Sequence, residues 1–504
     1  MTLFDGPAWL VYPIILPLAA GILSFLCRRA AFAVSMTAAV LNAAAVAVLV
    51  RQVLIFGSLR HHVGGWGPPL GITLRIDGPA VLMLTMAAVT GLGITLYARG
   101  YFAYRSAFGN ETGRHEHQAH YFWPLWMLLW TALNGLFLAN DIFNLYVLLE
   151  LIGVSAAALA ALSGKPPSQI AAFRYLLVSL VGSLCYLLGV FFLYRMYAVL
   201  DLDLLRNIAV AGPGLRAALA LISVGLLLKT ALFPMHFWLP PAHANALAPV
   251  SAILSGLVVK GSFYLIFRFW FDIFTPIVST SALNLLGGLG AAAVLWGAIQ
   301  AMRQQRLKLL VAYSTVSQLG YLFIAFPLAQ FGSGPEAWSA VLFMALAHAA
   351  AKSAMFMAAG SIFLHLGHDR IRDLAGIRAS LPVTSFAYAI AGVNLMGLPP
   401  SGGFIAKWLL LTASLTSAQW WWGMVIMAGS LLASVYVFRV VHRLFVIPVG
   451  HTADLRQPHT VLLEWPALSL ALFSLLLGMF APLPFTLLTT VGVYGPGLMA
   501  GGLP

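Results

Sequence analysis

The sequence predicts an all-α polytopic membrane protein with about fourteen transmembrane helices. Of its 504 residues, 61% are hydrophobic and 8% are charged, whereas about a quarter of the residues in typical soluble domains are charged. The mean hydropathy is +0.93. The apolar residues are also gathered into segments of about 17–25 residues, the length that crosses a bilayer. A soluble core cannot bury so much apolar surface, so we expect the chain to cross the membrane repeatedly.

Fourteen apolar segments follow one another along the chain, centred near residues 18, 41, 88, 130, 152, 186, 225, 259, 290, 318, 350, 395, 430 and 475. Residues 1–120 hold the first three, and 465–504 hold the last. The N-terminal stretch MTLFDGPAW lacks the basic region of a signal peptide, so we expect the first segment to be retained as a span. The loop 55–78 alternates apolar and polar residues around glycine and proline turns, which predicts a short β-hairpin.

Basic residues in the loops predict the orientation, because cytoplasmic loops are enriched in Lys and Arg. Four lie in one set of loops: Arg51, Arg60, Arg75 and Arg206. The alternate loops carry Arg28, Arg29, Arg99, Arg105, Arg114, Lys165, Arg303, Arg306, Lys308, Arg370, Arg372, Arg378, Arg443 and Arg456. We therefore place the second set in the cytoplasm of a cell with an inner (plasma) membrane. An even number of spans then puts both termini, and the hairpin, outside.

Several function classes are disfavoured by composition and motifs. The net charge of +13 is distributed as membrane topology requires, and no basic tail or motif indicates a nucleic-acid partner. Cys27 and Cys185 lie far apart within apolar sequence, which predicts neither a disulfide framework nor an iron–sulfur cluster. No haem, flavin or hydrolytic motif occurs. We expect no cofactor and no metal, and we leave open whether the chain belongs to a larger enzyme.

Four lysines lie inside apolar segments: Lys229, Lys260, Lys352 and Lys407. A lysine at the centre of a bilayer costs about 2.5–3.5 kcal/mol, so such residues are functional candidates. Glu150 is the acidic residue that lies deep in an apolar segment. Burial favours the neutral amine and a nearby carboxylate favours the charged form. The pattern therefore predicts a proton path through these side chains.

Two structural interpretations compete with a proton path. The lysines could extend their amines to the membrane surface along their aliphatic stems. Alternatively, Glu150 and one lysine could form an ion pair that only fixes helix packing.

Prolines interrupt the helical pattern beside two of the lysines. In LLKTALFPMHFWLPPAH (227–243), Pro234 lacks an N–H, so the carbonyl of Thr230 loses its helical donor. A freed carbonyl in hydrocarbon needs a partner or water. A break at membrane depth therefore predicts a wet, protein-lined cavity of the kind in which transporters bind ions.

The stretch MGLPPSGGFIAKW (396–408) repeats this arrangement before Lys407, with Pro399, Pro400, Gly402 and Gly403 as the interrupting residues. The two breaks lie five spans apart, so the two helices run in opposite directions. This spacing predicts two inverted repeats of five helices each, over residues 121–268 and 282–443.

Histidines near the lysines are candidates to link them, because imidazole titrates near neutral pH. His236 and His243 follow Lys229 at seven-residue steps, and His348 precedes Lys352 by one helical turn. Ser317 and Gln318 could hold water on the same path. For the histidines, a structural hydrogen bond is the competing interpretation, and for the polar pair it is helix packing.

Several stretches, in this order, resemble the antiporter-like subunits of Mrp-type Na⁺/H⁺ antiporters, respiratory complex I and membrane-bound hydrogenases. They are residues 227–264, RLKLLVAYSTVSQLGY (306–321), HAAAKSAMFMAAGS (348–361) and GLPPSGGFIAKW (397–408). The resemblance covers roughly residues 70–450 and is greatest to the D-type Mrp subunit.

The resemblance implies fourteen helices, two inverted repeats, and breaks in helices 7 and 12. It implies that Glu150 and Lys229 form the control pair of a first half-channel and that Lys260 is the linking lysine of helix 8. His348 would lie on the central polar axis, and Lys407 would exchange protons with the far side. Gln318 stands where several complex I members carry a histidine, so the relay there is either interrupted or dependent on water.

The function predicted is that of a proton-translocating antiporter-like subunit of a multisubunit cation/proton antiporter, in contact with homologous membrane subunits and with Na⁺ as the candidate ion for exchange. One alternative is a membrane-arm subunit of a complex I-like oxidoreductase or hydrogenase. Another is a scaffold or carbon-uptake module that keeps the channel residues for a different coupling.

Overall fold

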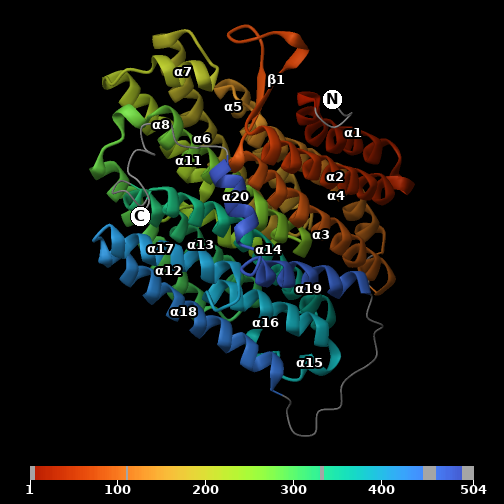
Figure 1. Ribbon diagram of the computed structural model, residues 1–504. Helices are drawn as coiled ribbons and strands as arrows, with labels where there is room; N and C mark the ends of the chain where they lie inside the picture. Colours follow the sequence, from red (N-terminus) through yellow and green to blue (C-terminus); the bar gives the residue numbers. More distant parts are fainter. Residues whose placement is uncertain (1–5, 109–111, 330–333, 447–460, 491–504) are drawn as a thin grey trace.

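The computed structural model describes residues 6–108, 112–329, 334–446 and 461–490 as a bundle of long helices with a small hairpin at one end (Figure 1). Twelve helices in these ranges are long and apolar enough to cross a membrane. When α16 and α17 are taken as halves of one interrupted segment and α19 as the last, each of the fourteen predicted positions carries a helix. The prediction of an all-α polytopic membrane protein is confirmed.

The elements follow in this order. The first third contains α1 (Tyr12–Leu26), α2 (Ala31–Phe56), β1 (Leu59–His62), β2 (Thr73–Ile76), α3 (Gly78–Phe108), α4 (Thr112–Leu138), α5 (Ile142–Ala161), α6 (Pro166–Tyr197) and α7 (Leu202–Ile208). The middle contains α8 (Pro213–Thr230), α9 (Leu239–Asn245), α10 (Ala248–Ile253), α11 (Val259–Arg268), α12 (Thr280–Arg303), α13 (Leu307–Leu328) and α14 (Gly334–Leu366). The last part contains α15 (Ile377–Ser380), α16 (Pro382–Met396), α17 (Gly402–Thr416), α18 (Trp420–Phe445), α19 (Val461–Leu476) and α20 (Pro482–Thr490).

Short irregular turns connect or interrupt these helices. The 3₁₀ turns are η1 (Pro7–Val11), η2 (Arg28–Ala30), η3 (Val63–Gly65), η4 (Met235–Trp238), η7 (Thr275–Ile277) and η8 (Ile371–Asp373). Two π-helical turns, η5 (Leu254–Val258) and η6 (Phe269–Ile273), flank α11. Polar side chains begin several helices, since a side-chain oxygen can accept from the free N–H groups of a first turn. Asp141, for example, accepts from the backbone N–H of Asn144 at 2.7 Å at the start of α5.

The predicted hairpin is confirmed: β1 pairs antiparallel with β2, with Leu59 opposite Ile76. It stands at the same end of the bundle as α7 (Figure 1). An ion-pair network fixes it there, through Arg60, Arg75, Asp77, Asp203, Arg206, Arg268 and Asp272.

Asp77, which immediately precedes α3, is the most buried member of this network. Its carboxylate lies 2.7 Å from the Arg268 guanidinium and 3.2 Å from that of Arg75. Burial alone would raise the pKa of Asp77, but the two guanidinium charges outweigh it and lower the pKa below its usual range. The carboxylate therefore stays ionised and holds the end of α11 against the hairpin.

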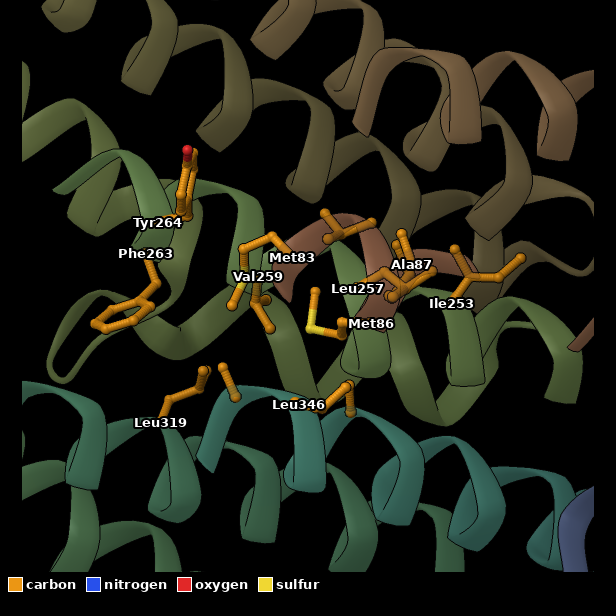
Figure 2. Packing of buried hydrophobic residues seen from close by; sticks show 14 of the residues in the cluster. Met83, Met86, Ala87, Ile253, Leu257, Val259, Phe263, Tyr264, Leu319 and Leu346 are labelled. Carbon is orange, nitrogen blue, oxygen red and sulfur yellow. The ribbon is translucent and has the colours of Figure 1, made fainter. Parts of the chain in front are cut away.

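The centre of the bundle is the segment that runs from α10 through η5 to α11. It is buried from Ala248 to Trp270. Figure 2 shows Met83, Met86 and Ala87 of α3 packed on one side of it. Leu319 of α13 and Leu346 of α14 lie on another side. Any charged group on this segment is therefore enclosed by protein and cannot reach lipid or bulk water directly.

Candidate functional site

The first predicted break is present in the chain. Helix α8 ends at Thr230, and Ala231 takes a left-handed conformation with φ of 58°. The chain then turns through η4 into α9. The indole N–H of Trp238 donates to the carbonyl of Leu228 at 3.0 Å, and the backbone N–H of Ala231 donates to it at 3.2 Å. A carbonyl that loses its α-helical donor at the break therefore has two other partners.

Lys229 lies in the last turn of α8 with only 8% of its surface exposed. Its Nζ donates to Ser179 Oγ at 2.8 Å and to the carbonyl of Leu149 at 3.4 Å. Glu150 Oε1 lies 4.0 Å from the same nitrogen. The structure thus brings together the predicted pair, but the serine is the closer partner.

Close helix packing makes this arrangement possible. A Cβ placed on Gly182 of α6 would lie 2.8 Å from the carbonyl oxygen of Gly225. One placed on Gly153 of α5 would lie 2.4 Å from Ser179 Oγ. The missing side chains let α5 approach α6 and let α6 approach α8, so the amine of Lys229 reaches both α5 and α6.

A small cavity adjoins Lys229 on the side of the central segment. Its volume is about 10 Å³, and Ser179, Lys229, Val258 and Ser262 are among its lining residues. A cavity of about 10–15 Å³ holds one water. A single water there would stand between the amine of Lys229 and the helix that carries Lys260.

Lys260 is fully buried on α11. Its Nζ donates to the carbonyl of Ser255, which lies in the π-helical turn η5. The hydroxyl of Ser255 is hydrogen bonded to Thr315 Oγ1 of α13 at 2.8 Å. Lys260 is therefore joined to α13 through Ser255, one residue of the π-helical turn.

Lys352 of α14 lies on the other side of that connection. Its Nζ donates to Ser314 Oγ and, at 2.9 Å, to the carbonyl of Val311. His348 lies one turn earlier on α14 and is 2% exposed. Both of its ring nitrogens lack a hydrogen-bond partner among the described residues. The charges of Lys260, Lys352 and Lys407 act on its ring, so the ring lies among the buried lysines.

The second predicted break is also present. Helix α16 ends at Met396, Gly397 takes a φ of 76°, and α17 begins at Gly402. Pro399 lies within the interruption. Ser401 Oγ accepts from the N–H of Phe404 at 3.2 Å, and Asn394 Oδ1 accepts from that of Gly403 at 2.8 Å. The start of α17 is thereby capped from both sides of the break.

Lys407 of α17 extends back toward the end of α16. Its Nζ donates to the carbonyl of Leu395 at 2.7 Å and lies 4.5 Å from the centroid of the Tyr321 ring. Gln318 Nε2 donates to the same carbonyl at 3.3 Å. Gln318 lies one turn after Ser314 on α13, so this helix connects the surroundings of Lys352 with those of Lys407.

Some predicted residues lie away from this line. Ser317 Oγ donates to the carbonyl of Val294 at 2.9 Å and joins α13 to α12, which is the packing alternative. The ring of His236 stacks on that of Phe233, with the ring centroids 5.5 Å apart. His243 of α9 is buried, and its ring stacks on that of Phe356 with the ring centroids 5.0 Å apart.

The placement of Lys308 differs from the sequence prediction of a cytoplasmic loop. The residue lies in the first turn of α13, is 6% exposed, and donates to the carbonyl of Ala246. The connection before it is so short that the helix begins at once. Sequence reasoning also missed Ser179, Ser255 and Thr315, because serine and threonine are common in membrane helices.

A family model described as "NADH:quinone oxidoreductase/Mrp antiporter, TM" matches residues 139–433. The N subunit of the NADH-quinone oxidoreductase of Desulforudis audaxviator is 35% identical, over 82% of this chain and 80% of its own length. The D-type subunit of the Na(+)/H(+) antiporter of Bacillus subtilis is 26% identical, over 94% of each chain. The predicted resemblance is confirmed.

A solved structure has the same fold. A chain of the Mrp complex from Dietzia sp. DQ12-45-1b superposes with a TM-score of 0.86 and 24% identity, over 99% of each chain. The match extends over both breaks and the helices that carry the buried lysines.

Proposed function

Because this chain belongs to the NADH:quinone oxidoreductase/Mrp antiporter transmembrane family, we propose that it is the proton-translocating, antiporter-like subunit of a multisubunit cation/proton antiporter of the Mrp type. Its partners would be other membrane subunits, including homologous antiporter-like ones. Na⁺ would be the ion exchanged, as the name of the Bacillus subtilis relative indicates.

The observation that carries this proposal is a line of four buried amines joined by polar groups. Lys229 faces a cavity of the size of one water, beside the segment that carries Lys260. Lys260 is joined to α13 through Ser255, and Lys352 contacts α13 at Ser314. Lys407 and Gln318 share one carbonyl at the far end of the line.

In the proposed relay a neutral amine accepts a proton and an ammonium donates one to the next neutral group. Glu150 stabilises the charged form of Lys229, so moving the carboxylate away favours release of the proton toward Lys260. His348 would pass the proton across the centre, since imidazole can accept at one nitrogen and donate from the other. Lys407 would exchange it with the far side of the membrane.

Transport by the intact complex in proteoliposomes tests the relay. Lys229→Ala and Glu150→Ala are each expected to abolish proton-coupled transport while the complex still assembles. Lys165→Ala is the matched control, because Lys165 is an exposed residue at the start of α6. Full transport by both variants would exclude the relay.

The second candidate function is a proton-pumping membrane-arm subunit of a complex I-like oxidoreductase or hydrogenase, powered by electron transfer in other chains. The 35% identity to the Desulforudis audaxviator oxidoreductase subunit favours it. Mass spectrometry of the intact purified complex separates the two. Flavin or iron–sulfur subunits would identify the redox complex, whereas small hydrophobic subunits without redox centres would identify the antiporter.

We also propose that residues 121–268 and 282–443 are inverted repeats and that the chain lies in the inner (plasma) membrane with the hairpin outside. The two breaks and the basic loops support this. Both termini, predicted outside, and Arg456 lie beyond the described residues. The single-cysteine variants Arg28→Cys and Arg60→Cys test the orientation. Each is treated in whole cells with a membrane-impermeant thiol reagent. Labelling at Arg60 alone is expected, and labelling at Arg28 alone would reverse the assignment.

A further inference from the structure

A basic cavity lies at one end of α3, away from the buried lysines. Its volume is about 710 Å³, and it opens between the α1–α2 turn, the end of α3 and the start of α4. Three exposed arginines line it: Arg28, Arg29 and Arg99. None of them has an ion pair or hydrogen bond to another described residue. Arg99 contacts an aromatic ring instead: its guanidinium carbon lies 5.0 Å from the centroid of the Phe32 ring.

Other polar groups of the cavity leave its charge positive. Glu116 is the acidic lining residue, and His117 and His120 are the other titratable ones. Both ring nitrogens of His120 are buried without a hydrogen-bond partner in the part of the chain that the structure describes. Three arginines against one carboxylate, with two imidazoles able to donate, form a site suited to an anion.

An apolar cavity of about 650 Å³ lies along the same helices, between α2, α3 and α19. On α3 it is lined by Leu92 and Leu96, and the basic cavity is lined by Arg99 and Ala103, each seven residues further along. On α2, Val46 lines the first cavity and Phe32, fourteen residues earlier, lines the second. Residues seven apart share a helix face, so the two cavities follow the same face of each helix.

The dimensions match one leaflet of a bilayer. The α3 residues that line the apolar cavity run from Thr85 to Leu96, which spans about 16 Å at 1.5 Å per residue. Half of a hydrocarbon core is about 15 Å. The arginines lie beyond this stretch, where a lipid head group would be, and Ile22, Phe25 and Leu26 of α1 are exposed beside them.

We propose that the basic cavity and the apolar groove together hold one anionic phospholipid, with its phosphate against Arg28, Arg29 and Arg99 and an acyl chain between α2 and α19. Basic pockets between membrane helices are suited to anionic lipid head groups. An acidic segment of a partner protein would match the arginines but not the apolar groove that continues from them. The inference does not depend on the proton relay.

Native mass spectrometry of the intact complex, taken from phosphatidylcholine nanodiscs doped with phosphatidylglycerol, tests the proposal. The wild-type complex is expected to retain phosphatidylglycerol in preference to phosphatidylcholine. The triple variant Arg28→Gln/Arg29→Gln/Arg99→Gln is expected to bind it about a hundredfold more weakly, because each basic residue near the membrane surface contributes roughly fivefold. Arg370→Gln/Arg372→Gln/Arg378→Gln is the matched control, since these exposed arginines line neither cavity.

A second variant distinguishes a phospholipid from a free phosphate ion. Ala47 is exposed on the wall of the apolar groove, so Ala47→Trp fills the groove without changing the arginines. Loss of the bound lipid in this variant supports the proposal. Retention of phosphate or lipid by Ala47→Trp, an equal loss in the control triple variant, or loss of a protein subunit in place of lipid from the arginine variant would each overturn it.

Discussion

The two interrupted segments resemble each other in form and differ in what surrounds their lysines. In the first, Lys229 precedes the break and has a serine at 2.8 Å and the Glu150 carboxylate at 4.0 Å. In the second, Lys407 follows the break and has a backbone carbonyl at 2.7 Å and an aromatic face at 4.5 Å. No carboxylate of the described residues forms an ion pair with Lys407.

This difference indicates separate roles for the two breaks. A carboxylate stabilises an ammonium by a full charge, whereas a carbonyl dipole and a ring face do so by partial charges. We infer that the first break holds a proton under the control of Glu150 and that the second gives it up more readily. The comparison predicts that equal substitutions of the two lysines slow transport alike but have unequal effects on stability.

The largest expected effect is on transport, and it is shared. In the proposed relay, Lys229→Met and Lys407→Met each remove a group that would accept and donate a proton. We expect each to slow proton-coupled transport by at least about a hundredfold, which is the lower end of what proton-transfer groups contribute. Proteoliposome assays of the intact complex, with Lys165→Met as the control, measure this. A near wild-type rate in either variant would remove that site from the relay.

The next effect is a loss of stability on substitution of the glycine beside Lys407. Gly397 has a φ of 76°, and a Cβ there would lie 2.8 Å from Lys407 Cδ. Because a left-handed conformation costs a residue with a side chain about 1–2 kcal/mol, we expect Gly397→Ala to lower the free energy of unfolding by at least that much.

The matched control for Gly397→Ala is Gly288→Ala in α12, where a Cβ would meet no atom within 4 Å. Thermal unfolding of the purified complex compares the two variants. Equal midpoint temperatures of unfolding for the two variants would show that the second break accommodates a side chain at Gly397 without loss of stability and does not hold Lys407 in place.

A smaller effect is the difference in protein stability between the Lys407→Met and Lys229→Met variants. Lys407→Met replaces a buried amine that has no carboxylate partner among the described residues, so we expect a change near zero or a slight stabilisation. Lys229→Met leaves Glu150 without its amine, and because this carboxylate is 26% exposed, we expect a loss of about 1 kcal/mol at most. A double-mutant cycle with Glu150→Gln measures the coupling. A coupling of zero would mean that the 4.0 Å pair exerts no control.

The smallest effect concerns the ring beside Lys407. Tyr321→Phe keeps the aromatic face and is expected to transport at the wild-type rate. Tyr321→Leu removes the face. The lost cation–π contact, which contributes about 0.5–1 kcal/mol at exposed sites and more when desolvated, is expected to change the rate by at least about threefold. A similar change in the phenylalanine variant would assign the effect to the hydroxyl instead.

Much of the architecture could be predicted because it depends on local patterns. The apolar segments, the interruptions at Pro234 and Pro399, and the hairpin all follow from neighbouring residues. The lysines stand out because charges are rare in apolar segments. The line that connects these lysines could not be predicted in the same way.

Contacts between distant residues account for most of what was missed. Ser255 and Thr315 are sixty positions apart, and nothing in the sequence distinguishes them from other hydroxyl residues. The burial of Asp77 and Arg268 depends on the hairpin folding back onto α11. For the same reason the sequence predicts a loop at Lys308, although the fold encloses it.

The π-helical turn η5 makes the geometry of the central segment depend on how many residues the turn contains. A π-turn closes its hydrogen bonds over five residues instead of four, so it contains one residue more than the α-helix it interrupts. Deleting one residue between Leu254 and Val258 would restore a regular α-helix and leave Lys260 on nearly the same face, because a π-turn takes up its extra residue within one turn. The amine would keep its direction, but the wide turn whose Ser255 carbonyl accepts from it would be gone. The connection across the centre therefore depends on the number of residues in this turn as well as on the residue types in it.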